Sequence, residues 1–303
     1  MVAADVNGAG GAEVLTPVRE GVRLTLAAVT RDFSHLPPLP DVLVKLMDHL
    51  QGDNAEIQQV ALLLSHDPVL VAKVLRVANS SLYGLSRRVS TMHDAVSILG
   101  LKAVRTVVVA TAMAAFFQSM EKPLAEAGYD ARAFWRHSVG AALCARLVAR
   151  EAGGDPEGAF IAALLHDVGY LILASRFPAQ YAQVLNYREL RDCHRIEAEN
   201  AWLGFSHAQI GAAFATNWNF PAEIHDAIAY HHEPDDPKFS PMAGVTHLAD
   251  IMAHVLNFAG DARPLAPELS EVIWQRLGLD WALFKILLGR AEQQYSETQA
   301  LFH

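Results

Sequence analysis

Apolar residues recur with a helical period along almost the whole chain from about residue 24, and the period-two alternation typical of strands is nearly absent. No Asn-Gly or Asp-Gly turn separates two alternating segments, so the sequence carries no hairpin signal. The pattern predicts an all-α fold of roughly a dozen helices joined by short connections.

Polar residues and prolines mark the ends of several predicted helices. An Asp-Pro pair places an N-cap before a proline in the first helical position, and this combination favours a helix start. The predicted starts are the Asp-Pro pairs at 67–68 and 155–156, Ser206 and Pro221. Gly100 lies where the helix containing MHDAVSILG is expected to stop, because glycine readily adopts the left-handed C-cap conformation.

The loops divide the chain into two lobes. Connecting stretches at 152–158, 233–241 and 260–268 interrupt the helical pattern, and a softer boundary falls at Glu121-Lys122-Pro123. The expected divisions are a tail over 1–23, an N-terminal helical lobe over 24–122 and a histidine-rich helical lobe over 123–303. The predicted architecture is a two-lobed multi-helix bundle.

Composition narrows the function classes. The 303 residues carry a formal net charge of −9, so no overall positive field attracts nucleic acid and no direct nucleic-acid partner is expected. Cys144 and Cys193 are the two cysteines, which fits a reducing cytoplasm rather than a disulfide scaffold. The N-terminus lacks the features of a signal peptide, and apolar runs such as 107–117 are too short to span a bilayer. We expect a cytoplasmic protein without a membrane partner.

Histidines are concentrated in the second half of the chain. Of the 14 histidines, four lie in residues 1–136 and ten in the rest. The string LLHDVG places His166 and Asp167 in an otherwise apolar, core-like helix, where unpaired ionisable groups would cost several kcal/mol. Adjacent residues point about 100° apart on a helix, so both side chains can reach one ion. Imidazole and carboxylate together suit Fe, Mn or Zn.

Further candidate ligands follow along the predicted helices: His137, His207, His231, His232 and Asp250. Six or seven such ligands from five helices would satisfy one or two octahedral metal ions. The histidines of this half of the chain also have explanations other than metal binding. A single histidine on an apolar helix is more often a hydrogen-bonded core residue, and this is the preferred interpretation of His194, His225, His247 and His254. His207 alone would suit a first turn near solvent, and His231-His232 would suit a helix C-terminus, where imidazolium is favoured.

The order His137, His166-Asp167, His207, His231-His232, Asp250 resembles the HD superfamily of metal-dependent phosphohydrolases. The strings LPPLPDVLVKLMDHL and SHDPVLVAKVLRVANSSLYGLSRRVSTMHDAVSILG in the first lobe resemble more narrowly the HDOD family, the HD-related output domains. The resemblance covers roughly residues 32–255. It implies an all-α bacterial signalling domain with a regulatory or scaffolding role, often without demonstrated catalysis.

The resemblance also implies a ligand set. His137, His166, Asp167 and Asp250 would hold one ion, and Asp167 would bridge to a second ion. The ligands of that second ion would be His207, His231 and His232.

The sequence departs from the related HD-GYP cyclic-di-GMP phosphodiesterases. Their HD motif usually continues as HDxGK, whereas this chain has HDVGY, with Tyr170 in place of the lysine, and a neutral phenol cannot contact phosphate as a point charge. The GYP stretch after the paired histidines is missing, and the additional glutamate of some relatives would fall at Ala133. These departures argue against cyclic-di-GMP hydrolysis.

Two functions from different classes remain. The preferred one is a non-catalytic regulatory output protein that binds signalling proteins or a small nucleotide-like ligand and holds one or two divalent ions (Fe, Mn or Zn). A homodimer is a further expected partnership. The alternative is a phosphohydrolase acting on a nucleotide or cyclic dinucleotide, with Asp167 in the catalytic centre. Six basic residues against two acidic ones over 67–106 suggest an anion site, although a solvated helix face is the preferred interpretation.

Overall fold

A computed structural model describes most of the chain. The described residues are 24–38, 57–65, 67–80, 82–126, 128–233, 236, 238–260 and 265–298. Within these ranges every regular element is a helix, which confirms the predicted all-α class. The predicted tail over residues 1–23 lies outside the described residues.

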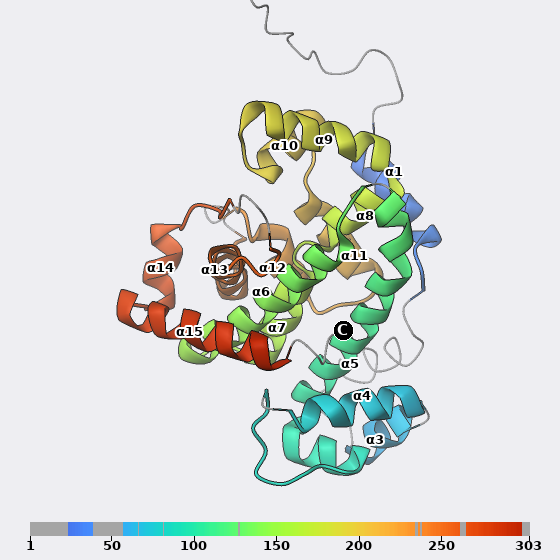
Figure 1. Ribbon diagram of the computed structural model, residues 1–303, viewed down its shortest axis with the longest axis vertical. Helices are drawn as coiled ribbons and strands as arrows, with labels where there is room; N and C mark the ends of the chain where they lie inside the picture. Colours follow the sequence, from blue (N-terminus) through green and yellow to red (C-terminus); the bar gives the residue numbers. More distant parts are fainter. Residues whose placement is uncertain are drawn as a thin grey trace, which may run out of the picture.

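The helices run in the following order along the chain. They are α1 (Leu26–Arg31), the 3-10 helix η1 (Asp32–His35), α3 (Ile57–Ser65), α4 (Pro68–Ala78), α5 (Met92–Glu126), α6 (Ala131–Glu151), α7 (Pro156–Leu165), α8 (Val168–Arg176), α9 (Pro178–Arg191), α10 (Arg195–Trp202), α11 (His207–Asn217), α12 (Ala222–Tyr230), α13 (Pro241–Val255), α14 (Glu271–Leu277) and α15 (Trp281–Thr298). Figure 1 shows α3, α4 and the start of α5 at one end of the molecule and the remaining helices gathered above them.

The predicted helix caps are present. The Asp67 carboxylate accepts hydrogen bonds from the backbone N–H groups of Val69 and Leu70, and Asp155 caps α7 in the same way. Ser206 forms a capping box at α11. Gly100 interrupts α5 with a φ of 82°, a left-handed conformation that glycine adopts without strain, so the predicted stop is confirmed as a break in this helix.

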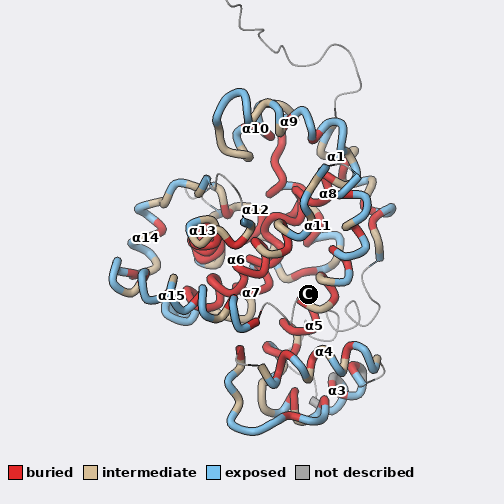
Figure 2. The backbone as a smooth tube through the Cα atoms, viewed as in Figure 1, coloured by how far each residue is buried: buried red, intermediate tan, exposed pale blue. Residues whose placement is uncertain are grey.

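The core is centred on α6, α7, α8, α11 and α13, which Figure 2 shows as a continuous buried interior. Helix α8 packs very closely on α11. A Cβ atom added at Gly169 would lie 2.0 Å from the carbonyl oxygen of His207, so only glycine permits this approach. The close contact fixes the first residue of α11 directly beside the start of α8.

The structure corrects the expectation of one continuous helix through His166-Asp167. Helix α7 ends at Leu165 and α8 begins at Val168, so the two residues form the turn between them. Asp167 has φ −99° and ψ 8°, outside the helical range. The apolar residues continue on both sides of the turn because both helices lie in the core.

Two helical stretches of the described chain are long and apolar enough to cross a membrane by length and composition, Met92–Glu126 and Pro156–Arg176. These stretches include polar residues and are interrupted at Gly100 and at His166-Asp167, so they differ from uninterrupted apolar runs such as 107–117. In the most apolar window, 50% of the first stretch and 94% of the second are buried within the fold. Core helices of globular domains have the same property, so these stretches are weak indicators of a membrane span.

A polar cluster joins the first-lobe motif ANSSLYG to the start of α7. Arg146 on α6 donates a hydrogen bond to the Glu157 carboxylate at 2.5 Å, and its guanidinium lies 4.4 Å from the centre of the Tyr83 ring. On the surface beside it, Lys102 pairs with Asp155 at 3.0 Å. The predicted division at residue 122 stays a prediction, and α5 continues across it.

Candidate metal centre

The structure brings all seven predicted ligands into one cluster, in which six side chains are buried and His232 is half-buried. His137 comes from α6, His166 and Asp167 from the turn between α7 and α8, and Asp250 from α13. The remaining three come from the start of α11 and the turn after α12: His207, His231 and His232. Their role as ligands stays a prediction, whereas their proximity is a property of the fold.

One half of the cluster surrounds Asp250. Its Oδ1 atom lies 3.0 Å from Nε2 of His137 and 3.5 Å from Nε2 of His166. The two imidazole Nε2 atoms are 3.4 Å apart, and His166 Nε2 lies 3.6 Å from Asp167 Oδ2. All these side chains are less than 10% exposed. This arrangement corresponds to the first ligand group expected from the resemblance.

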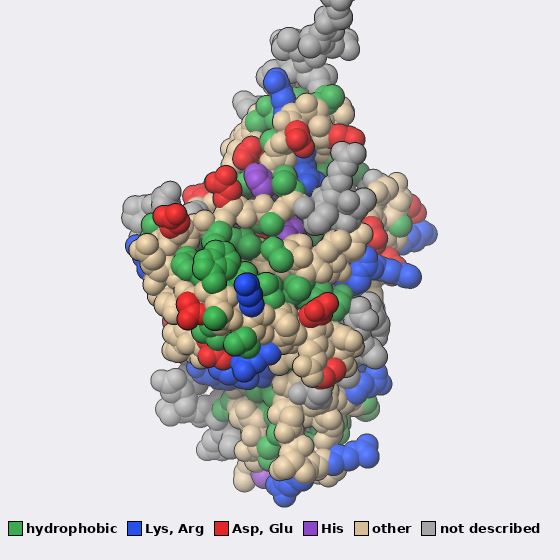
Figure 3. Space-filling view, turned by 60° about the vertical axis from the view of Figure 1, so that its left-hand side comes forward, with side chains coloured by type: hydrophobic (Ala, Val, Ile, Leu, Met, Phe, Trp, Pro, Cys, Tyr) green, Lys and Arg blue, Asp and Glu red, His purple; other side chains and the backbone are tan. Residues whose placement is uncertain are grey.

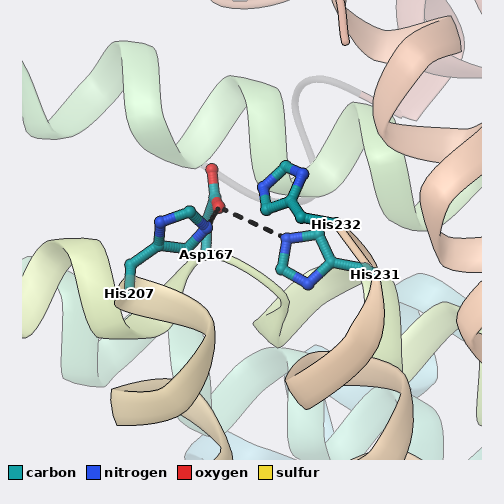
Figure 4. Close-up of side chains that lie close together, drawn as sticks. All are labelled: Asp167, His207, His231 and His232. Carbon is teal, nitrogen blue, oxygen red and sulfur yellow. Dashed lines mark ion pairs between the residues drawn. The ribbon is translucent and has the colours of Figure 1, made fainter. Parts of the chain in front are cut away.

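The other half surrounds the second oxygen of Asp167. Its Oδ1 atom lies 3.1 Å from Nε2 of His207 and 4.0 Å from Nε2 of His231. His232 completes the group, and ligand atoms of the four residues all lie within 4.8 Å of one another. Figure 4 shows the four side chains pointing toward a common centre. Asp167 therefore faces the two halves with different oxygens, as a bridging carboxylate must.

The outer nitrogens of three histidines are tied to fixed acceptors. His166 Nδ1 donates to the Ala163 carbonyl at 2.7 Å, and His231 Nδ1 donates to the Ile228 carbonyl at 2.7 Å. His207 Nδ1 lies 2.6 Å from Oε2 of the buried Glu199. A ring that donates from Nδ1 has its lone pair on Nε2 when neutral, so three lone pairs point into the cluster. Metal-ligating histidines are oriented in this way by their outer hydrogen bonds.

The inner atoms lack hydrogen-bond partners among the described residues. His207 Nε2, His231 Nε2 and Asp250 Oδ1 are buried and unsatisfied. When the histidines are neutral these atoms are all acceptors, and opposing acceptors at these distances repel unless a proton or a metal ion lies between them. A divalent ion would satisfy them, and the mixed nitrogen and oxygen donor set suits Fe, Mn or Zn. The residues present therefore fit a metal centre of one or two ions.

When metal is absent, protonated histidines paired with carboxylates stabilise the cluster. Burial disfavours the charged imidazoles, yet the neighbouring carboxylates raise the pKa of His166 to about 9 and that of His207 to about 10. Burial and the positive charges of those two rings lower the pKa of His231 to about 3. Burial opposes ionisation of Asp167 and Asp250, but the adjacent histidines keep the pKa of each carboxyl well below its usual value.

Residues that the sequence did not single out also form part of the site. Glu199 and Arg195 both lie on α10, and the Arg195 guanidinium approaches Asp167 Oδ2 to 3.8 Å. His254, expected to be a core residue, is 22% exposed at its side chain and has Nε2 3.4 Å from Asp250 Oδ1. It follows Asp250 by one helical turn, which is the one sequence signal that could have placed it here.

The other histidines have simpler roles. His247 is a buried core residue, as expected, and its Nδ1 hydrogen-bonds to the backbone carbonyl of His231. His194 and His225 are only half-buried, so their expected core placement is wrong. His194 precedes α10, and His225 pairs with its neighbour Asp226 at 2.9 Å.

The basic excess in the first lobe is spread over different surroundings. Arg76, Arg87 and Arg88 are exposed and line an open groove between α4 and the following loop, whereas Lys102 pairs with Asp155 in the second lobe. Asn79 fixes this groove, because its side-chain amide both donates to and accepts from the backbone of Val89.

Comparison with solved structures supports the fold. An HDOD domain protein of unknown function from Geobacter sulfurreducens has a TM-score of 0.73 at 27% identity, covering 91% of this chain and 96% of that one. A candidate phosphohydrolase from Shewanella amazonensis has a TM-score of 0.67 at 27% identity, with the same coverages. A candidate signal transduction protein from Marinobacter aquaeolei has a TM-score of 0.70 at 25% identity, covering 93% of this chain and 61% of that one.

The family assignment rests on a match over most of the chain. The HDOD domain profile matches residues 36–234, which include six of the seven clustered side chains, all except Asp250. The chain spans less than half the length of the curated relatives that it matches. The long first-lobe strings and the histidine order of the second lobe fall within the matched region, and the chain belongs to the HDOD family.

Proposed function

We propose that this HDOD chain is a regulatory output protein that holds one or two divalent ions of Fe, Mn or Zn and acts by binding instead of turnover. The observation that carries the metal part is the convergence of histidine Nε2 atoms on Asp167 and Asp250, with the outer nitrogens already tied to acceptors. An ion would replace the protons that hold the metal-free cluster together, and would join five helices at one point.

The regulatory part is supported by what surrounds the cluster. Tyr170 is buried against the rings of Tyr129 and Tyr181, so this position supplies packing and no charge for a phosphate. On another face, α14 and α15 expose Val272, Trp281 and Ile286. Figure 3, with this side turned forward, shows hydrophobic side chains gathered beside charged ones. Such a face suits a protein partner, either a signalling protein or a second copy of the chain.

The partner and location follow from the same proposal. A signalling role in the cytoplasm would use either a protein partner on an exposed face or a small nucleotide-like ligand at the centre. A direct nucleic-acid partner is not proposed, because the chain has a formal net charge of −9.

Elemental analysis tests the metal part. Protein purified aerobically and anaerobically should contain close to one or two equivalents of transition metal, and His166→Ala should lose most of it. His225→Ala is the matched control, since His225 is half-buried, pairs with Asp226 and lies outside the cluster. Equal metal in wild type and His166→Ala would exclude this centre.

The second candidate function is phosphohydrolysis, favoured by the bridging position of Asp167 and by the positive charge of Arg195 beside it. Bound ions would act as Lewis acids toward a phosphate and lower the pKa of a water molecule. The chain's own residues would orient the ions and exclude bulk water. We expect no appreciable cyclic-di-GMP hydrolysis with iron or manganese loaded. Robust turnover that is lost in Asp167→Ala would instead establish the enzyme.

A further inference from the structure

Arg195 holds a positive charge at the edge of the metal centre without a hydrogen-bonded partner among the described residues. It is the first residue of α10, and its guanidinium carbon lies 3.8 Å from the centre of the Tyr170 ring. Its Nη1 atom is 3.8 Å from Asp167 Oδ2, beyond hydrogen-bond distance. The Nε atom is buried and unsatisfied, while the side chain as a whole is 27% exposed.

The surrounding packing keeps this guanidinium in place. Tyr170 is 4% exposed and is held between the rings of Tyr129 and Tyr181, so the surface under Arg195 is rigid. One turn further along α10, Glu199 is tied to both the backbone and the ring of His207. Both ends of the helix turn are thus fixed relative to the cluster. The planar guanidinium group of Arg195, with its N–H donors, is already positioned for a ligand that reaches the centre from solvent.

The formal charges around the centre indicate what that ligand is. Asp167, Asp250 and Glu199 contribute three negative charges, Arg195 contributes one positive charge, and histidine ligands are neutral. One divalent ion balances the site. Two divalent ions leave a surplus of two positive charges in a buried region, where uncompensated charge is costly. The doubly loaded centre therefore favours a dianion over a monoanion.

We propose that the centre, when loaded with two divalent ions, is a receptor for a dianionic phosphate, either inorganic phosphate or the terminal phosphate of a monoester, and that Arg195 is the binding residue that selects it. This inference rests on the metal centre of the proposed function. Guanidinium groups bind tetrahedral phosphates through two parallel hydrogen bonds, which the free edge of Arg195 can supply. A phosphodiester carries a single negative charge and leaves the surplus only half compensated.

Isothermal titration calorimetry with inorganic phosphate tests the proposal, using manganese-loaded protein in buffer free of sulfate and phosphate. Arg195→Gln should weaken phosphate binding by roughly 10- to 100-fold, the loss expected for a charge-assisted hydrogen bond. Arg195→Lys keeps the positive charge but loses the planar pair of N–H donors. Its phosphate affinity should lie between that of Arg195→Gln and that of wild type. Arg191→Gln is the matched control, because Arg191 also lies over a tyrosine ring, that of Tyr187 at 5.7 Å, on the exposed end of α9. It should bind phosphate as wild type does.

Two further measurements separate the possible failures. Elemental analysis of each sample reports metal content, so a wild type that takes up no metal overturns the proposed function and this inference with it. A metal-loaded wild type that binds no phosphate, or a loaded Arg195→Gln that binds it with unchanged affinity, overturns this inference alone. Dimethyl phosphate, a monoanionic diester, should bind wild type at least about 10-fold more weakly than phosphate. Equal binding of the two probes would contradict the charge argument.

Discussion

The Oε2 atom of Glu199 makes two contacts with His207. It accepts a hydrogen bond from the backbone N–H at 2.7 Å, and it lies 2.6 Å from the ring Nδ1. The carboxylate is fully buried, and its other oxygen lies 3.4 Å from the Tyr181 hydroxyl. One side chain therefore caps the first turn of α11 and fixes the tautomer and direction of a candidate ligand. This makes Glu199 a positioning residue of the candidate centre, acting through His207.

The first prediction concerns this support. Glu199→Gln should lower metal affinity by about 10- to 100-fold, because the outer partner that orients His207 and raises its basicity is weakened. Metal titration followed by calorimetry would measure the change. Glu197→Gln, an exposed residue on the same helix, is the control and should leave the affinity unchanged. An unaltered affinity in Glu199→Gln would show that His207 is not a ligand.

The second prediction concerns Gly169. Gly169→Ala should destabilise the protein by about 3 kcal/mol, because its Cβ would lie 2.0 Å from the His207 carbonyl oxygen and would force α8 away from α11. Metal content should fall with it, since Asp167 and His207 would separate. Gly289→Ala is the control. Gly289 lies in the exposed face of α15 with no atom within 4 Å of a new Cβ, so this change should stabilise by up to about 1 kcal/mol. Denaturant unfolding measures the change in stability of both variants.

The third prediction concerns Arg146 and Glu157. Arg146→Met should cost about 3–5 kcal/mol in unfolding free energy, because the Glu157 carboxylate is left largely buried without its cation. Lys102→Met removes the cation of the neighbouring pair with Asp155, where the lysine side chain is 75% exposed, and should cost less than about 1 kcal/mol. Similar losses in the two variants, measured by urea unfolding, would contradict the burial argument.

The fourth prediction concerns pH. In the metal-free protein the pKa values of His166 and His207 are raised to about 9 and about 10, above the usual value of about 6.5 in an unfolded chain. Their protonation therefore stabilises the fold fully below about pH 6.5, and this stabilisation is lost as pH rises through the folded pKa values. The melting temperature of metal-free protein should fall from pH 6.5 to pH 9.

Metal-loaded protein is the comparison for this pH series. Its histidine ligands are already deprotonated, so the difference in melting temperature between loaded and metal-free protein should widen by several degrees as pH rises. Other groups that titrate over this range, such as the buried Cys144 thiol, affect both samples alike. A difference that stays constant from pH 6.5 to pH 9 would contradict the proton-held cluster.

Local signals predicted the helix ends well. The caps at Asp67, Asp155 and Ser206 and the break at Gly100 depend on a few neighbouring residues, so they can be read from the chain. The break at His166-Asp167 could not, because the apolar pattern continues through it. That break depends on tertiary packing, which holds α7 and α8 as separate buried helices.

The site shows the same division between local and tertiary information. The order of histidines and aspartates identified seven side chains that the fold brings together, while Arg195 and Glu199 were missed. Both lie on a short helix with a mixed polar sequence, and their inward direction depends on tertiary contacts, of Glu199 with His207 and of Arg195 with Tyr170. His254 was missed because one turn of spacing from Asp250 is equally typical of an ordinary core histidine.

Helix α7 connects two places that are distant in the fold. Its first turn contains Glu157, which is clamped by Arg146 beneath the Tyr83 ring, and the residue after its last turn is His166. The ten residues of this helix form a stiff rod about 15 Å long. The first lobe therefore contacts one end of the helix whose other end positions the candidate ligand His166.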